Sequence, residues 1–168
     1  RKHTINEYLE ICEKLKKINP NLEFSSDFII GYPGESDQDF KDTLEVIEKI
    51  KFINSYSFIF SPRPGTKAAN CELVDKKISL ERLRIIQSLL FDNQSNKNKS
   101  LENKTLSILV ENLAKNEKYV FGRTEFMTPV ILEGKKEDIG KILLVKIKTS
   151  NRSTLFGEKI KNLNKRVA

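Results

Sequence analysis

Two stretches of the sequence constrain the fold more than any other feature. Residues 26–36 read SDFIIGYPGES and residues 56–66 read YSFIFSPRPGT, and each is an apolar run that ends in a turn rich in Gly and Pro. The segment between them has the apolar spacing of an amphipathic helix. This order predicts a βαβ unit with parallel strands. Because ligand-binding groups gather at the carboxyl ends of such strands, we expect both turns to face one ligand.

Local signals place the helices and strands around this unit. Thr4 followed by Glu7, and Ser36 followed by Asp39, have the spacing of capping boxes and predict two helix starts. A further amphipathic helix is expected to begin near Ser79.

The apolar residues 28–30 do not alternate with polar ones, which is typical of a parallel strand buried on both faces. Residues 53–61 form the second predicted strand. The polar residues 92–100 either extend the last helix or form a linker, and they mark the expected domain boundary.

The pattern of apolar and polar residues changes beyond residue 100. Short β segments follow one another at regular spacing, separated by Gly, Asn and charged turns. This pattern favours a small antiparallel β-barrel. The predicted strands are 105–110, 119–123, 129–132, 142–148 and 155–160.

Charge is divided unevenly along the chain. Residues 1–94 hold 14 Lys and Arg against 15 Asp and Glu, a net charge of −1, whereas residues 95–168 hold 16 against 8, a net charge of +8. A concentrated basic module indicates a polyanionic partner, because cations near phosphates release condensed counterions. The alternative is a basic surface that only keeps the protein soluble. No apolar run is long enough to cross a membrane, so we expect no membrane partner.

The first half of the chain cannot form a complete α/β domain. Two parallel strands and three helices leave apolar strand faces without partners. We therefore predict that residues 1–98 are the last part of a larger α/β barrel whose earlier strands lie upstream. Residues 99–161 then form the RNA-binding β-barrel, and residues 162–168 form a basic tail. The expected fold class is α/β plus all-β.

Several sequence motifs, in this order, resemble the radical S-adenosylmethionine (SAM) methylthiotransferases that modify tRNA. DFIIGYPGE at 27–35 and YSFIFSPRPGTKAA at 56–69 resemble late strands and loops of their partial TIM-like barrel. The segments KTLSILVE, FGRT, IGKILLVKI and TLFGE, between residues 104 and 158, resemble their TRAM domain, an OB-like barrel that binds tRNA in this family. SPRPGT and GRT favour the member that acts beside the tRNA anticodon.

The resemblance implies an enzyme that converts N6-isopentenyladenosine next to the anticodon to its 2-methylthio derivative. Its cofactors would be SAM and 4Fe-4S clusters, which need sets of Cys ligands. This chain has only Cys12 and Cys71, 59 positions apart, and both are interpreted as structural. We therefore expect no metal ligand and no catalytic residue in this chain, and no activity of the chain alone.

The resemblance also assigns the binding residues. Gly31, Pro33, Gly34 and Glu35 are the expected cofactor loop, although an ordinary strand-to-helix turn would use the same residue types. Phe121 or Phe126 would stack a base. The expected substrate and RNA contacts are Arg63, Lys104, Arg123, Lys141, Lys146 and Arg152.

Two classes of function stay open at this point. One is the tail of a cytoplasmic, monomeric tRNA methylthiotransferase that binds the tRNA anticodon stem-loop and receives electrons from a separate donor. Within this class, a different tRNA base or a ribosomal protein is an alternative substrate. The other class is a non-catalytic RNA-binding module. The unpartnered apolar faces argue against the second class.

Overall fold

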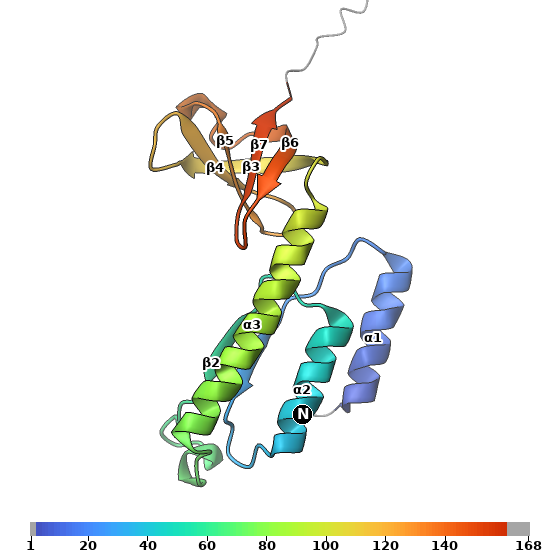
Figure 1. The fold of residues 1–168 in the computed structure, drawn as a ribbon, viewed down its shortest axis with the longest axis vertical. Helices are drawn as coiled ribbons and strands as arrows, with labels where there is room; N and C mark the ends of the chain where they lie inside the picture. The colour runs from blue at the N-terminus through green and yellow to red at the C-terminus, as the bar shows by residue number, and fades with distance from the viewer. Residues whose placement is uncertain (1–2, 161–168) are drawn as a thin grey trace, which may run out of the picture. The chain divides into compact units, whose positions relative to one another are not determined.

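The computed structural model describes residues 3–160 (Figure 1). The chain divides between Asn93 and Gln94 into two compact units, which are considered separately below. The expected basic tail at 162–168 lies outside the described residues.

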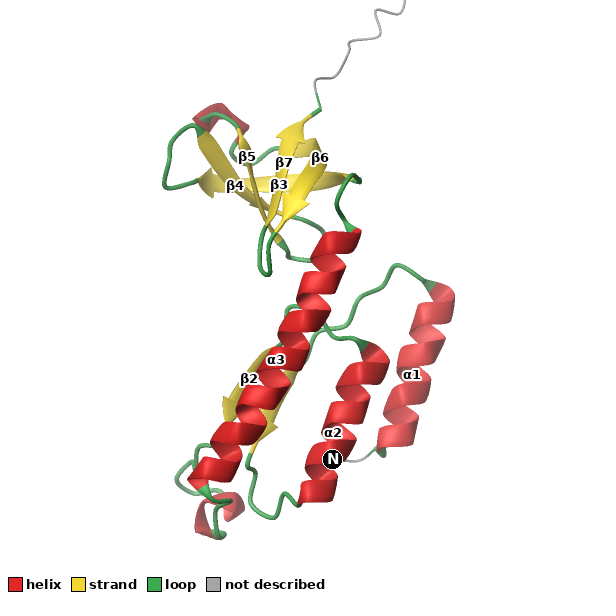
Figure 2. Cartoon of the chain, in the orientation of Figure 1, coloured by secondary structure: helices red, strands yellow, loops and turns green. Residues whose placement is uncertain are grey.

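The N-terminal unit contains the predicted βαβ arrangement. Strands β1 (Asp27–Ile30) and β2 (Tyr56–Ile59) pair in parallel, with Asp27 opposite Tyr56 and Ile30 opposite Ile59. The helices are α1 (Ile5–Ile18), α2 (Asp37–Ile50), the 3₁₀ turn η1 (Lys67–Asn70) and α3 (Lys76–Ser100), drawn in red in Figure 2. Both predicted capping boxes are confirmed, at Thr4 and at Ser36.

Helix α3 differs from the expectation at its start. It begins at Lys76, where the Asp75 carboxylate accepts hydrogen bonds from the N–H groups of Lys77 (2.8 Å) and Ile78 (3.2 Å). Ser79, near which the helix was expected to begin, is therefore a buried residue of its first turn. At the other end, α3 continues to Ser100, so residues 92–100 extend the helix and do not form a linker.

One face of the two-stranded sheet is buried and the other is not. Ile30 packs with Phe40 and Ile47 of α2 and with Ile86 and Leu90 of α3 in one apolar core. On the opposite face, Ile29, Tyr56 and Phe58 are 57%, 66% and 54% exposed. Within this chain the core therefore covers only one face of β1, because side chains alternate along a strand. The exposed face is one of the apolar strand faces that were expected to lack partners here.

The C-terminal unit is a closed five-stranded barrel in the order β3-β4-β5-β7-β6. Its apolar core consists of Leu101 and inward-facing strand residues. The strands are β3 (Thr105–Leu113), β4 (Tyr119–Arg123), β5 (Pro129–Glu133), β6 (Ile142–Ser150) and β7 (Leu155–Lys159), with the 3₁₀ turn η2 (Lys136–Asp138) before β6.

The five predicted strands are present, but the barrel is not wholly antiparallel. Strands β5 and β7 pair in parallel, with Ile131 opposite Phe156. This pairing closes the cylinder, and closure removes the exposed strand edges that an open sheet would leave.

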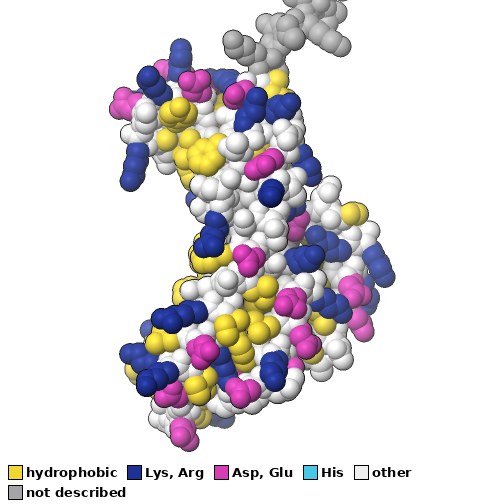
Figure 3. All heavy atoms as spheres, viewed as in Figure 1, with side chains coloured by type: hydrophobic (Ala, Val, Ile, Leu, Met, Phe, Trp, Pro, Cys, Tyr) yellow, Lys and Arg dark blue, Asp and Glu magenta, His cyan; other side chains and the backbone are white. Residues whose placement is uncertain are grey.

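Strand β4 lies unusually close to β3. A Cβ atom at Gly122 would be 2.4 Å from the Leu109 carbonyl oxygen, so glycine is required there. The pairing of β3 with β4 is also interrupted by a bulge between Val110 and Asn112. The bulge places Asn112 directly opposite Phe121. Figure 3 shows Lys and Arg side chains around the periphery of this barrel, with hydrophobic side chains exposed among them.

Candidate functional site

The loops that follow β1 and β2 each contain a turn of the same type. Glu35 N–H donates to the Tyr32 carbonyl (2.9 Å), and Thr66 N–H donates to the Arg63 carbonyl (3.2 Å). In each turn a Pro-Gly pair occupies the two central positions, and the glycine has a positive φ, 86° at Gly34 and 82° at Gly65. These are the requirements of a type II turn.

Both loops lie at the same edge of the sheet, as expected from the parallel pairing of β1 with β2. The rings of Tyr32, from the loop after β1, and Phe60, directly after β2, pack edge to face with their centroids 5.0 Å apart. Arg63 is exposed in the second loop. The fold therefore brings the predicted cofactor loop and the segment containing Arg63 to one side of the N-terminal unit.

The Glu35 carboxylate accepts hydrogen bonds from two groups within this unit. Its Oε2 atom accepts a hydrogen bond from Gly31 N–H (2.8 Å), and its Oε1 atom accepts one from Arg82 Nη1 (2.7 Å). Arg82 Nη2 also donates to Asp37 Oδ1 (2.5 Å). The carboxylate thus closes its own loop and ties that loop to α3.

Arg82 is the residue of this site that sequence reasoning missed. It is 6% exposed, and its guanidinium carbon lies 5.3 Å from the centre of the Phe40 ring. Burial alone would lower its pKa, but the hydrogen bonds to Asp37 and Glu35 outweigh this effect and raise the pKa. A signal was available, because Arg82 lies on the helical stripe that also contains the buried residues Ser79 and Ile86.

The glycines and proline of the first loop are in different environments. Gly31 is buried with φ 71°, and a Cβ there would be 2.4 Å from Ser79 Oγ. By contrast, a Cβ at Gly34 would meet no atom within 4 Å. Pro33 is half-buried between them. Glycine is therefore needed at position 31 because α3 is in close contact there, and it is favoured at position 34 because the turn requires a positive φ. The space beside Gly34 is open.

The predicted RNA-binding cations are spread over the barrel. Lys104 and Lys146 are neighbours, because Thr105 is opposite Lys146 and Ile147 N–H donates to the Lys104 carbonyl (2.9 Å). Lys141 directly precedes β6 at the other end of that strand. All three lysines are exposed, and none forms an ion pair within residues 3–160.

The two predicted arginines have different surroundings. Arg123 donates from Nε to Glu111 Oε2 (3.2 Å) and from Nη1 to the Met127 carbonyl (3.1 Å). Its guanidinium carbon is 5.3 Å from the centre of the Phe121 ring. Arg152 is exposed in the turn between β6 and β7. The barrel therefore brings Lys104 and Lys146 together and leaves Arg123 paired with a carboxylate.

The two candidate stacking residues are both half-buried. Phe121 lies on the outer face of β4, since its neighbours Val120 and Gly122 are buried and face inward. Phe126 lies in the turn between β4 and β5, and Lys97 Nζ lies 4.8 Å from the centre of its ring.

The described residues do not fit an iron–sulfur cluster. Cys12 is buried and Cys71 is exposed, and no group of three or more His, Cys, Asp or Glu residues in the described part could hold a metal ion. Among residues 3–160, no helix has the length and apolar character needed to span a membrane.

Residues 99–160 match the TRAM domain family, so the closed five-stranded barrel is a TRAM domain. The similarity to known proteins continues through the N-terminal unit. The chain is 64% identical over all of its 168 residues to the tRNA-2-methylthio-N(6)-dimethylallyladenosine synthase of Pelagibacter ubique (strain HTCC1062). It is therefore a relative of the tRNA-2-methylthio-N(6)-dimethylallyladenosine synthases, and the resemblance to tRNA methylthiotransferases is confirmed.

Two further relatives carry the same name. The protein of Ruthia magnifica subsp. Calyptogena magnifica is 42% identical over 95% of this chain, and that of Wolbachia pipientis wMel is 38% identical over 94%. The chain spans 38% of the length of the Pelagibacter protein and 36% of each of the other two. The chain thus corresponds to little more than a third of a synthase of this kind.

Proposed function

We propose that this chain is the tRNA-binding part of a tRNA methylthiotransferase. The enzyme converts N6-isopentenyladenosine, also called N6-dimethylallyladenosine, to its 2-methylthio derivative. The observation that carries the proposal is the 64% identity to a synthase of this name over the whole chain, which includes both Pro-Gly loops and the TRAM domain in one order. The TRAM domain binds the tRNA, and the adenosine next to the anticodon is the substrate.

The N-terminal unit belongs, in this proposal, to a larger radical SAM barrel. The exposed apolar face formed by Ile29, Tyr56 and Phe58 supports this, because such a face is stabilised when further secondary structure covers it. In the whole enzyme, SAM and 4Fe-4S clusters supply the radical and sulfur chemistry. The cluster ligands come from parts of the enzyme other than this chain.

The first Pro-Gly loop contributes its backbone to the SAM site. Gly31, Pro33 and Gly34 form the turn, and the open space beside Gly34 leaves room for a ligand. Glu35 holds the turn closed through Gly31 N–H and joins it to Arg82, so it acts on the site by fixing the loop. The exposed Arg63 reaches substrate or RNA phosphate from the second loop.

The RNA contacts of the barrel are made by exposed cations. Lys104, Lys141 and Lys146 lack ion-pair partners among residues 3–160, so binding phosphate breaks no ion pair at these positions. Arg123 and Arg152 add further positive charge. The enzyme works as a monomer in the cytoplasm and takes electrons from a separate protein.

A chimaera tests the enzymatic proposal. The segment of the Pelagibacter synthase that aligns with this chain is replaced by this chain, and the hybrid is expressed in a bacterial strain that lacks its own synthase. We expect 2-methylthio-N6-isopentenyladenosine to reappear when nucleosides from the tRNA are analysed by mass spectrometry. A well-expressed hybrid that leaves N6-isopentenyladenosine unmodified would contradict the proposal.

Binding to RNA is tested separately with the chain itself. Fluorescence anisotropy with an anticodon stem-loop RNA should show an affinity that falls steeply with salt. The double variant Lys104→Gln/Lys146→Gln should lower the salt slope by about 2, because each phosphate contact contributes about 1. The control Lys41→Gln/Lys77→Gln removes two exposed lysines of the N-terminal unit and should leave the slope unchanged. Equal effects of the two double variants would contradict an RNA contact at Lys104 and Lys146.

A further inference from the structure

Two aromatic side chains lie at the edge of the sheet where the Pro-Gly loops begin, and the proposed function gives them no role. Tyr32 is the second residue after β1, and Phe60 directly follows β2. Their rings pack edge to face, with the centroids 5.0 Å apart. Tyr32 is 52% exposed and Phe60 is half-buried. Both loops lie at the same end of the N-terminal unit (Figure 1), so the two rings form one aromatic surface beside them.

Strand geometry places Phe60 on the exposed face of the sheet. Because side chains alternate along a strand, Phe60 continues the row of Tyr56 and Phe58, whose ring centroids are 6.4 Å apart. Helices α2 and α3 cover the other face through the core around Ile30. In a parallel α/β barrel the helices lie outside the strands, so the exposed face becomes the inner face of the proposed larger barrel.

The position of the two rings along this face indicates contact with a ligand. Side chains within the strands, such as Tyr56 and Phe58, fill the interior of a parallel barrel. Side chains beyond the carboxyl ends of the strands line its mouth, where the active sites of such barrels lie. Tyr32 and Phe60 are at this end, and the exposed ring of Tyr32 offers apolar surface that a ligand can cover.

The name that the relatives share includes a group that matches such a surface. They are named for a dimethylallyladenosine, whose N6 substituent is a branched hydrocarbon. This substituent has no hydrogen-bond donor or acceptor, so a protein can recognise it only by burying it against apolar surface. Aromatic side chains provide a large apolar area for this purpose. SAM fits the rings less well, because its sulfonium, amino and carboxylate groups are charged and only its adenine is apolar.

We propose that Tyr32 and Phe60 contact the dimethylallyl group of the substrate adenosine and thereby select it over unmodified adenosine. The inference rests on the proposed function and adds the residues that determine its substrate preference. Arg63 comes three positions after Phe60 and is exposed. The segment that presents the ring to the base therefore also presents the cation proposed to bind phosphate.

The test uses the hybrid synthase that contains this chain and two anticodon stem-loop RNAs. One RNA carries N6-dimethylallyladenosine next to the anticodon, and the other carries adenosine there. Fluorescence anisotropy gives both affinities, and their ratio is the readout. We expect the hybrid to bind the modified RNA about tenfold more tightly or better, because apolar pockets discriminate by about this factor for a single methylene group. Tyr32→Ser should lower the ratio about tenfold and leave the affinity for unmodified RNA unchanged.

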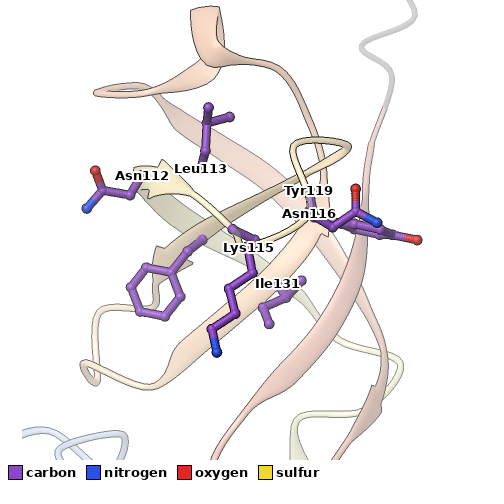
Figure 4. A pocket seen from close by; sticks show the side chains of 8 residues that line it. Asn112, Leu113, Lys115, Asn116, Tyr119 and Ile131 are labelled. Carbon is purple, nitrogen blue, oxygen red and sulfur yellow. The ribbon is translucent and has the colours of Figure 1, made fainter.

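Three further variants define the contact. Tyr32→Phe keeps the ring and should keep the ratio, whereas Phe60→Leu removes the second ring and should lower it. The matched control is Tyr119→Ser, which removes another exposed tyrosine. Tyr119 lines a groove on the TRAM domain (Figure 4). An RNA contact there would change both affinities equally, so the ratio should stay the same.

The outcomes separate this assignment from the proposed function. A ratio that survives Tyr32→Ser would overturn the assignment, and so would equal affinities of the original hybrid for the two RNAs. If Tyr32→Ser instead weakens SAM binding in equilibrium dialysis and leaves the ratio intact, the rings belong to the cofactor site. A hybrid that prefers the modified RNA through Tyr32 but forms no 2-methylthio nucleoside would contradict the proposed function and support the contact.

Discussion

Arg82 and Glu35 are 47 positions apart, yet the arginine Nη1 atom lies 2.7 Å from the glutamate Oε1 atom, and only 7% and 12% of the two side chains are exposed. The same carboxylate accepts a hydrogen bond from Gly31 N–H through its other oxygen. One ion pair therefore connects helix α3 to the loop that follows β1. The conformation of the predicted cofactor loop depends on a helix that comes about 50 residues later in the chain.

Replacing Arg82 by Met should strongly destabilise the N-terminal unit. The Glu35 side chain is only 12% exposed, and the substitution removes its cationic partner. Removing one partner of a buried ion pair lowers the free energy of unfolding by about 3 kcal/mol. Urea unfolding followed by circular dichroism measures the loss.

The matched control is Arg84→Met, which changes an exposed arginine of the same helix and should stay within about 0.5 kcal/mol of the original protein. The double variant Arg82→Met/Glu35→Gln should be less unstable than Arg82→Met alone, because it removes the buried carboxylate that Arg82→Met leaves unpaired. Asp37, the other partner of Arg82, has 89% of its side chain exposed to water in the structure. Additive losses would show that the two residues do not act as a pair.

Acid should weaken the barrel through Asp138. The hydrogen bonds from Lys159 Nζ (2.8 Å) and from Lys135 N–H (3.1 Å) lower the pKa of this carboxyl in the folded state. Its contribution to stability is therefore complete above the unfolded pKa of about 4 and is lost as the pH falls through the folded pKa.

Asp138→Asn should accordingly lower the free energy of unfolding by about 2 kcal/mol at neutral pH, and by progressively less as the solution is acidified. Denaturant titrations of both proteins across this pH range measure the difference. Glu137→Gln, at the exposed neighbouring position, serves as control. A difference that did not depend on pH would show that the carboxylate charge is not what stabilises the barrel.

Asn98 should stabilise the C-terminal unit by connecting the last turns of helix α3 to the turn between β6 and β7. It is fully buried, and its Nδ2 atom donates to the carbonyls of Asn151 (3.0 Å) and Arg152 (3.2 Å). Asn98→Ala leaves these carbonyls without their donor and should cost about 2 kcal/mol in thermal or chemical unfolding. Asn96→Ala, at an exposed position of the same helix, should have little effect. Similar melting temperatures for the two variants would refute this role of Asn98.

Gly122→Ala should disrupt the pairing of β3 with β4. The added methyl would lie 2.4 Å from the Leu109 carbonyl oxygen and 2.8 Å from Ile108 Cγ2, so the strands must separate. We expect a loss of about 2 kcal/mol or more. Gly140→Ala meets no atom within 4 Å and pays only the cost of its positive φ, about 1 kcal/mol. Equal stability of the two variants would argue against close strand contact at Gly122.

Much of the local structure could be predicted because its causes lie within a few residues. The capping boxes at Thr4 and Ser36 are contacts between residues three positions apart. The five strands of the barrel were recognisable from their apolar patterns and turns. The start of the last helix was predicted only approximately, because it was expected near Ser79, whereas the helix begins at Lys76 and Ser79 packs against Gly31.

The candidate site was predicted less completely than the fold. The Pro-Gly loops and the exposed lysines could be recognised from residue type. The predicted phosphate ligand Arg123 pairs with Glu111, a residue 12 positions away on the neighbouring strand. Residue type alone does not show whether a cation already has a partner, because that depends on which strands become neighbours.

The sequence by itself determined where helices and turns begin, which segments are strands, and where positive charge is concentrated, since all three depend on residue identity over short distances. Only the tertiary structure decided that Arg82 binds Glu35, that β5 and β7 close the barrel in parallel, and that a bulge sets Asn112 opposite Phe121. These contacts join residues distant in the chain, and their geometry depends on how whole elements pack and on the register in which strands pair.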